Sequence, residues 1–252
     1  MLANKYPTDK EAKEMIVDIG KRIYEKGFVA SNDGNISVKV SAEHIWTTPT
    51  GVSKGFMTPN MMVKMDLDGN VIEGEWKPSS EIKMHLRVYK ENGEVKSVTH
   101  AHPFYATICA ISGIPLDMPV LVEAILQLGV IPIARYATPG TEEVPNSIVP
   151  FCREYNGVLL SNHGALTWGA DIYQSYYRLE VMEYYAKVIL ELKKLNDAGR
   201  PLSKQQIKEL EKIKLSMGMT AGQLQKGSDY ATNDKDILPA LCNKEYGGDK
   251  NC

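Results

Sequence analysis

The sequence predicts a mixed α/β fold in which helices cover a central sheet that is largely antiparallel or mixed. Segments with helical periodicity are interspersed with short alternating segments typical of strands. Several neighbouring strands are joined by turns too short to contain a crossover helix, which favours antiparallel pairing. Because no repeat or low-complexity linker interrupts the chain, we expect one domain over residues 1–218. Residues 219–252, rich in Gly, Asp, Asn and Lys, are expected to form a partly flexible tail.

The clearest predicted helix spans residues 8–27. Thr8 and Glu11 have the spacing of a capping box, apolar residues recur at helical intervals, and Gly27 supplies a stop. Other segments with helical patterns are 79–92, a helix beginning at Pro103, 122–129, 171–199 with Asp171 as its cap, and 203–218 with a Ser203/Gln206 capping box. Strand-like segments are 35–40, 44–49, a hairpin over 61–74 with its turn at 68–70, 95–102, 130–137 and 157–164.

Composition excludes several classes of protein. The 252 residues are 43% hydrophobic and 24% charged, with a formal net charge of -2 and no dense basic cluster, so we expect no nucleic-acid partner. The most apolar region, 104–134, is broken by Pro115, Asp117 and Pro119, so it does not predict a membrane helix. The N-terminus lacks the apolar core of a signal peptide, and the four cysteines show no paired spacing. We therefore expect a cytoplasmic protein with reduced thiols.

The stretch "VTHAHP" places His100 and His102 one residue apart on a predicted strand. Residues i and i+2 of a strand share a face and lie roughly 6.5–7 Å apart, so both rings can reach one metal ion. His163, followed at once by Gly164, ends another apolar strand and completes a set of three histidines. Three ligands leave a coordination position open, as catalytic metal sites require. The alternative is histidines that pack or bond to backbone, and we assign no role to the remaining two, His44 and His85.

A second pattern is "PSSEIK", where Ser79, Ser80 and Glu81 open a predicted helix. Free amide groups and the helix dipole favour an anion at such a position, and the two hydroxyls add donors. The alternative is ordinary capping, which accounts for one serine better than for two.

Small polar loops at 31–37 and 47–55 could also hold an oxyanion, with Asn35, Thr50 and Gly51 as the candidate contacts. Either loop alone is more often an ordinary turn. Glu123 lies at the start of an otherwise apolar helix and is a further candidate acid or base.

Six motifs in order, "DGNIS", "TTPTG", "PSSE", "HAHP", "YATPGT" and "NHG", make the chain similar to the class II aldolase/adducin-head family. Within that family it most resembles the zinc-dependent L-fuculose-phosphate aldolase group, over about residues 10 to 200. The resemblance implies a three-layer α/β/α sandwich with a mainly antiparallel sheet. It also implies a homotetramer with active sites at subunit interfaces.

The resemblance further implies roles for the candidate residues. His100, His102 and His163 would hold one divalent metal per subunit, most often Zn²⁺, with Mn²⁺ or Co²⁺ as alternatives. Glu81 would be the catalytic acid or base and could serve as a fourth ligand. Residues implied to bind the substrate phosphate are Asn35, Thr50, Gly51, Ser79 and Ser80.

The implied activity is a metal-dependent aldolase. It would reversibly cleave a ketose 1-phosphate, such as L-fuculose 1-phosphate or a related deoxypentulose 1-phosphate. The products would be dihydroxyacetone phosphate and an aldehyde, formed through a metal-stabilised enediolate.

Two alternatives stay open. No tyrosine lies between residues 106 and 135, where these aldolases carry one, whereas Glu123 resembles the acid/base of a methylthioribulose-1-phosphate-type dehydratase. That branch lacks the glutamate found here as Glu81, and Tyr230 or Tyr246 of the tail could supply the missing hydroxyl. The second alternative is a non-catalytic adducin-like binding domain, which the complete histidine set disfavours.

Overall fold

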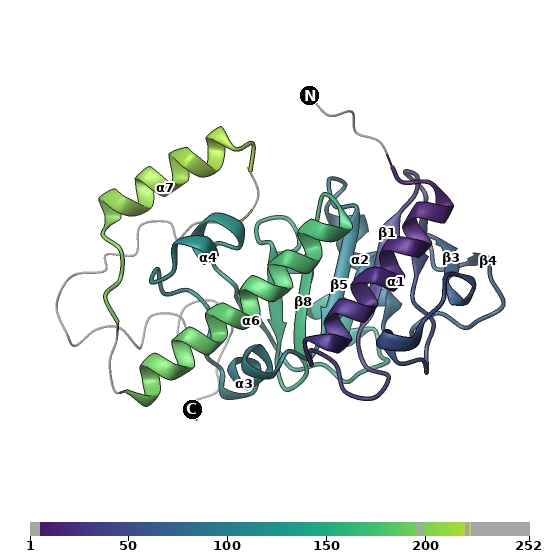
Figure 1. Cartoon of the computed structure of the whole chain (residues 1–252), viewed down its shortest axis with the longest axis horizontal. Helices are drawn as coiled ribbons and strands as arrows, with labels where there is room; N and C mark the ends of the chain where they lie inside the picture. The colour runs from purple at the N-terminus through teal and green to yellow at the C-terminus, as the bar shows by residue number, and fades with distance from the viewer. Residues whose placement is uncertain (1–5, 196–198, 220–221, 223–252) are drawn as a thin grey trace.

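The computed structural model describes residues 6–195, 199–219 and 222, which form an α/β fold around one sheet (Figure 1). The eight strands lie in the order β4-β3-β2-β1-β5-β8-β7-β6. All neighbours are antiparallel except β6 and β7, which are parallel, so the predicted mainly antiparallel sheet is confirmed. The strands are β1 (Asn35–Lys39), β2 (His44–Thr47), β3 (Val63–Asp66), β4 (Val71–Glu73), β5 (Ser97–Ala101), β6 (Ile133–Ala134), β7 (Gly157–Leu160) and β8 (Gly164–Gly169).

Helices cover both faces of the sheet, which gives three layers. The helices are α1 (Asp9–Glu25), α2 (Ile82–Glu91), α3 (Phe104–Ser112), α4 (Val122–Gln127), α5 (Glu143–Ser147), α6 (Ile172–Lys194) and α7 (Lys204–Ser216). Helices α1, α3, α4 and α6 bury apolar side chains on one face, such as Ile16 of α1 and Leu179 of α6. Helices α2 and α5 cover the other face, where Val88 of α2 and Val144 of α5 join one buried cluster. Helix α7 packs against α4, away from the middle of the sheet.

The local signals in the sequence place most of these elements. Both predicted capping boxes are present, at Thr8 and at Ser203, and Gly27 has the left-handed φ of +68° expected where a chain leaves a helix. Pro103 is the residue before α3 rather than its first residue. The extended segment predicted over 130–137 pairs as a strand only at β6. Strand β8 and helix α5 were not predicted.

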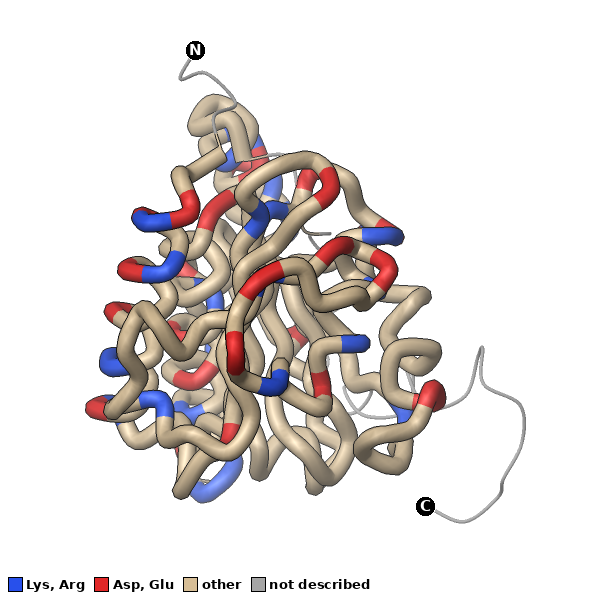
Figure 2. Tube along the Cα trace, turned by 90° about the vertical axis from the view of Figure 1, so that its right-hand side faces the viewer, with Lys and Arg blue, Asp and Glu red and all other residues tan. Residues whose placement is uncertain are grey.

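Some expectations fall outside what the structure describes. Of the predicted tail, 219–252, only Met219 and Gly222 are described, and Tyr230 and Tyr246 lie outside the described residues. Among the helices that are described, none combines the length and the apolar character needed to cross a membrane. Figure 2 shows lysine, arginine and acidic residues interspersed along the chain rather than segregated by sign.

Candidate active site

The three histidines come together at one end of neighbouring strands. His100 lies in β5, and His102 follows directly after that strand ends. His163 lies in the turn between β7 and β8, rather than at the end of a strand as the sequence predicts. Because β8 pairs with β5, this turn brings His163 next to the other two rings. The ring centroids are 4.8 to 5.0 Å apart, and one nitrogen of each ring lies within 4.8 Å of the others.

The protonation of His100 and His102 suits a cation. His100 Nδ1 lies 2.9 Å from the Ala165 carbonyl oxygen, which can only accept, so Nδ1 carries the hydrogen and Nε2 is bare. His102 Nδ1 lies 3.4 Å from Asp33 Oδ2, which favours the same tautomer. The two Nε2 atoms are 3.2 Å apart. Two lone pairs converging at this distance repel each other unless a proton or a metal ion lies between them, so the donor set fits a divalent metal.

Burial keeps these rings neutral. His100 is fully buried, and this burial lowers its pKa to about 3, although Glu81 acts in the opposite direction. Burial also lowers the pKa of His102. A neutral imidazole is the form that ligates a metal, so the site is ready to bind one at neutral pH.

Glu81 faces the histidine cluster from the residue that precedes α2. Its Oε1 lies 3.0 Å from His163 Nε2, and its Oε2 lies 3.5 Å from His100 Nε2. Asn35 Nδ2 donates a hydrogen bond of 2.9 Å to the same Oε2. Burial alone would raise the pKa of Glu81, but His100 and His163 outweigh it and hold that pKa well below the usual range. The carboxylate is therefore ionised where it could ligate a metal or move a proton.

Two loops that were predicted to bind phosphate lie side by side. The Thr50 amide donates to the Lys77 carbonyl at 2.9 Å, and the Ser79 amide donates to the Thr48 carbonyl at 3.2 Å. Thr50, Gly51 and Ser80 are exposed, whereas Ser79 is buried. Asn35 is also buried, and its amide nitrogen is engaged by Glu81. The loops thus lie side by side with Thr50, Gly51 and Ser80 at the surface, and their phosphate role stays a prediction.

Lys54 is a site residue that the sequence did not reveal. Its side chain is buried, and Nζ donates to the carbonyl oxygens of Asn32 at 2.9 Å and Val52 at 2.6 Å. Burial lowers its pKa to about 8, against the opposing effect of Asp33 and Glu81. Lys54 therefore ties the loop before β1 to the loop after β2. A lysine in a polar loop gave no signal of this burial.

Glu123 shows no pairing with these groups among the described residues. It is exposed in the first turn of α4, and no hydrogen bond or ion pair of the described residues joins it to the histidines. A shallow pocket of about 220 Å³ instead opens beside Glu81, with Ser80, Gly140 and Thr141 among its lining residues. Lys83, also at this pocket, forms an ion pair of 2.5 Å with Glu142 and so ties α2 to the loop that follows β6.

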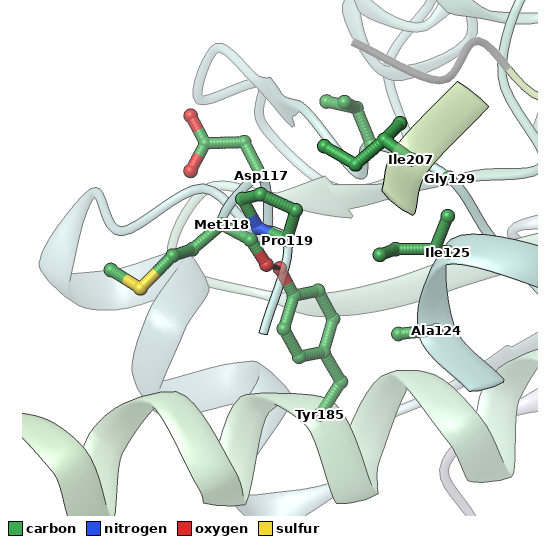
Figure 3. Close-up of a pocket in the computed structure, with 9 residues that line it drawn as sticks. Asp117, Met118, Pro119, Ala124, Ile125, Gly129, Tyr185 and Ile207 are labelled. Atoms are coloured by element: carbon green, nitrogen blue, oxygen red, sulfur yellow. Dashed lines mark hydrogen bonds between the residues drawn. The ribbon is translucent and has the colours of Figure 1, made fainter. Parts of the chain in front are cut away.

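A second pocket lies between α4, α6 and α7 (Figure 3). It has a volume of about 300 Å³ and is lined mostly by apolar side chains such as Ile125 and Ile207. The hydroxyl of Tyr185 donates to the Met118 carbonyl at its wall. Neither Glu81 nor any of the three clustered histidines lines it, whereas Glu81 does line the pocket described above.

Comparison with known proteins identifies the family. The profile of the "Class II Aldolase and Adducin N-terminal domain" family matches residues 14–190. The chain belongs to this family. It is an enzyme of the class II aldolase type, a metal-dependent class, and its three clustered histidines could hold a metal ion.

Relatives of this class II aldolase carry two different names. It is 30% identical, over 81% of its length and 98% of the relative, to a 3-oxo-tetronate 4-phosphate decarboxylase of Haemophilus influenzae. It is 32% identical, over 71% of its length and 95% of the relative, to an L-fuculose phosphate aldolase of Methanocaldococcus jannaschii. Among solved structures, an L-fuculose 1-phosphate aldolase matches with a TM-score of 0.76 and 29% identity, over 84% of this chain and 99% of that one. Both names thus contain a phosphorylated compound, L-fuculose phosphate in one and 3-oxo-tetronate 4-phosphate in the other.

Proposed function

We propose that the protein is a divalent-metal-dependent aldolase that reversibly cleaves a ketose 1-phosphate to dihydroxyacetone phosphate and an aldehyde. L-fuculose 1-phosphate or a related deoxypentulose 1-phosphate is the proposed substrate. The proposal rests on the Glu81 carboxylate, which lies 3.0 Å from His163 Nε2 and 3.5 Å from His100 Nε2 inside the histidine cluster. The relatives named L-fuculose phosphate aldolase support this choice of substrate.

His100, His102 and His163 would hold the metal, and Glu81 would complete the ligand set before substrate binds. Three imidazoles and a carboxylate suit Zn²⁺, with Mn²⁺ and Co²⁺ as alternatives. When bound there, the metal would act as a Lewis acid that polarises the ketose carbonyl and stabilises the negative charge left after cleavage.

The residues of the chain perform the remaining tasks. Cleavage of the bond between C3 and C4 removes a proton from the C4 hydroxyl and leaves an enediolate that must be protonated at C3. Glu81 is ionised and held by Asn35, so in the cleavage direction it could accept the proton that the C4 hydroxyl loses and then deliver it to C3. The loops that carry Thr50, Gly51, Ser79 and Ser80 would bind the phosphate, which orients the substrate relative to Glu81.

A second candidate reaction is the decarboxylation of a phosphorylated 3-oxo acid. The relative named 3-oxo-tetronate 4-phosphate decarboxylase covers 81% of this chain. Loss of CO₂ from such an acid leaves a carbanion next to a carbonyl, as retro-aldol cleavage does. The same site could therefore stabilise both products.

We also propose a homotetramer with its active sites at subunit interfaces. Tyr173, Tyr177 and Tyr184 are spaced to lie along one side of α6, and their side chains are 36%, 45% and 59% exposed. We call these three residues the α6 aromatic face. Exposed aromatic side chains that share one helix face are typical of subunit contacts.

The reaction is tested with purified protein loaded with Zn²⁺, Mn²⁺ or Co²⁺. Dihydroxyacetone phosphate release from ketose 1-phosphates is measured beside CO₂ release from 3-oxo-tetronate 4-phosphate. We expect release of dihydroxyacetone phosphate. Its absence with every ketose 1-phosphate and every metal would refute the aldolase, and CO₂ release would then establish the second candidate.

The role of Glu81 is tested in the same assay. Glu81→Gln should lower kcat about 10²–10⁴-fold, because it removes the acid/base while leaving three histidine ligands for the metal. Glu123→Gln is the matched control and should keep wild-type activity. Full activity of Glu81→Gln would refute its role, and loss of activity in Glu123→Gln would favour the dehydratase chemistry.

A further inference from the structure

A chain of buried polar side chains lies between β1 and α2, behind Glu81. Ser37 and His85 are fully buried, and Tyr89 is 2% exposed. Ser37 Oγ lies 2.7 Å from His85 Nδ1 and 2.7 Å from the Tyr89 hydroxyl. Helix α2, which carries His85 and Tyr89, also contributes apolar residues such as Val88 to the buried cluster on this face of the sheet.

The hydrogen bonds that link Tyr89, Ser37 and His85 all have the same donor-to-acceptor direction. Burial raises the pKa of Tyr89, so its hydroxyl stays protonated, and the Val98 amide also donates toward its oxygen. The Tyr89 hydroxyl then donates a hydrogen bond to Ser37 Oγ, its side-chain partner. The Ser37 hydroxyl in turn donates a hydrogen bond to His85 Nδ1. The opposite direction would leave the Tyr89 hydrogen without an acceptor among the residues that the structure describes. His85 is therefore the tautomer that carries its hydrogen on Nε2.

Two buried atoms near this chain have no partner among the residues that the structure describes, His85 Nε2 and Asn35 Oδ1. They are complementary. His85 Nε2 is a donor by the argument above. Asn35 Oδ1 is an acceptor, because the Asn35 amide must direct Nδ2 at the Glu81 carboxylate, which only accepts. A donor and an acceptor that are both buried and both unpaired point to a small molecule that joins them.

The backbone places the two atoms in adjacent rows. Asn35 and Ser37 are two residues apart on β1, so their side chains share a face and are roughly 6.5–7 Å apart. Glu81 and His85 are four residues apart at the start of α2, one turn from each other. Asn35 contacts Glu81 and Ser37 contacts His85, so the pairs form two parallel rows. Burial lowers the pKa of His85, and the charge of Glu81 acts in the opposite direction.

We propose that His85 is a positioning residue for Glu81, acting through one buried water and Asn35. His85 Nε2–H donates to the water, the water donates to Asn35 Oδ1, and Asn35 Nδ2 donates to Glu81 Oε2. A flipped Asn35 amide would set its oxygen against the Glu81 carboxylate and would make the water accept from two donors, with neither of its own hydrogens bonded to Asn35. The arrangement therefore fixes the Asn35 amide and, through it, the direction of the Glu81 carboxylate. The catalytic consequence rests on the proposed function, whereas the water site and the tautomer do not.

Two variants of His85 separate positioning from packing. His85→Phe keeps a ring but removes both nitrogens, so we expect kcat to fall about 10-fold or more with KM and metal content little changed. His85→Gln returns a donor near the position of Nε2 and should recover most of kcat. His44→Phe is the control: His44 also contacts a serine, with Nδ1 3.1 Å from Ser41 Oγ, but lies away from Glu81 and should keep wild-type kcat. Equal loss in the Phe and Gln variants, or no loss in either, would overturn the proposal.

A second readout does not depend on activity. Nitrogen-15 NMR of the metal-free protein should show His85 as the neutral tautomer with hydrogen on Nε2, and a high-resolution crystal structure should show a water about 2.6–3.2 Å from both His85 Nε2 and Asn35 Oδ1. Hydrogen on Nδ1, or an empty position between the two atoms, would overturn the proposal. If both signatures are found but no sugar phosphate is cleaved, the proposed function fails and the buried water site stands.

Discussion

Lys54 places a positive charge inside the protein at the junction of two loops. Its Nζ donates to the carbonyl oxygens of Asn32 and Val52, and one loop leads into β1 while the other carries Thr50 and Gly51. Hydrogen bonds from a charged donor are among the stronger interactions that fix a loop. Lys54 thus connects the segment that precedes Asn35 with the segment proposed to bind phosphate.

We expect Lys54→Met to raise the KM for the sugar phosphate about 10-fold while kcat changes less, because both loops lose a shared anchor and binding weakens by about 1.4 kcal/mol. Steady-state kinetics of the variant would measure this. Lys10→Met is the matched control, since Lys10 is exposed on α1 and forms only a surface ion pair. An unchanged KM in Lys54→Met would show that the loops do not depend on this anchor.

The buried histidines predict how stability depends on pH. Burial lowers the pKa of both His85 and His100 to about 3, whereas an unfolded histidine titrates near pH 6.5. Between these values the unfolded chain binds more protons than the folded chain, so stability is lost as pH falls below about 6.5. Each ring contributes a slope of about 1.4 kcal/mol per pH unit over the steep part of this range.

We therefore expect the free energy of unfolding of the metal-free protein to fall by about 2 to 3 kcal/mol between pH 6 and pH 5. Urea denaturation at a series of pH values measures it. The window avoids Glu81, whose lowered pKa contributes only below about pH 4.5. His85→Phe should lower the slope by the contribution of one ring, about 1.4 kcal/mol per pH unit, and an identical slope in that variant would contradict a neutral buried His85.

Helices α1 and α7 begin with the same type of cap but lie in different surroundings. Thr8 and Glu11 form the first capping box, and Ser203 and Gln206 form the second. Helix α1 buries a row of apolar residues against the sheet, whereas Lys214 is the one fully buried residue of α7. The two caps should therefore differ in what their loss does to the whole molecule.

Thr8→Ala should lower the free energy of unfolding by about 1 kcal/mol, because it removes a cap from a helix that folds with the core. Ser203→Ala should leave global unfolding nearly unchanged and instead increase hydrogen exchange in α7. Urea denaturation and hydrogen exchange measure the two effects. A larger global loss from Ser203→Ala than from Thr8→Ala would contradict this ranking.

The sequence predicts those elements that are specified by residues close together along the chain. Caps and alternation predicted α1 and β1, and strand spacing indicated that the rings of His100 and His102 share a face, from which both can reach one metal ion. The position of His163 depends on the pairing of β5 with β8, which joins residues about 65 positions apart and leaves no local signal. Helix α5 is too short, and Pro145 too disruptive, for a periodic pattern to reveal it. The burial of Lys54 and His85 likewise depends on packing that no local pattern encodes.

At the scale of the whole molecule, the α6 aromatic face is the basis for an expected assembly. Tyr184 is its most exposed member, at 59%. Light scattering should give a mass of about 112 kDa, four times the chain mass of 28.0 kDa. Tyr184→Glu should shift the protein toward smaller species, because it places a charge in an apolar contact. Lys10→Glu, on exposed α1, should leave the mass unchanged.

A wild-type mass of 28.0 kDa at working concentration would contradict the tetramer. An unchanged mass in Tyr184→Glu would instead show that the assembly uses another surface. The two results are distinct, because the first addresses the assembly itself and the second addresses the face that forms it.

The two outer strands of the sheet bear on how the protein behaves when it is concentrated. Strand β4 has three residues, its side chains Val71 and Ile72 are about half exposed, and its pairing with β3 contains a register shift between Lys64 and Met65. Strand β6, at the opposite edge, has two residues. Such short or irregular edge strands present few unpaired backbone groups in a regular row. An edge strand of another molecule therefore has few groups with which to form hydrogen bonds. Lengthening β4 by repairing its register would be the change most prone to produce fibrous aggregates.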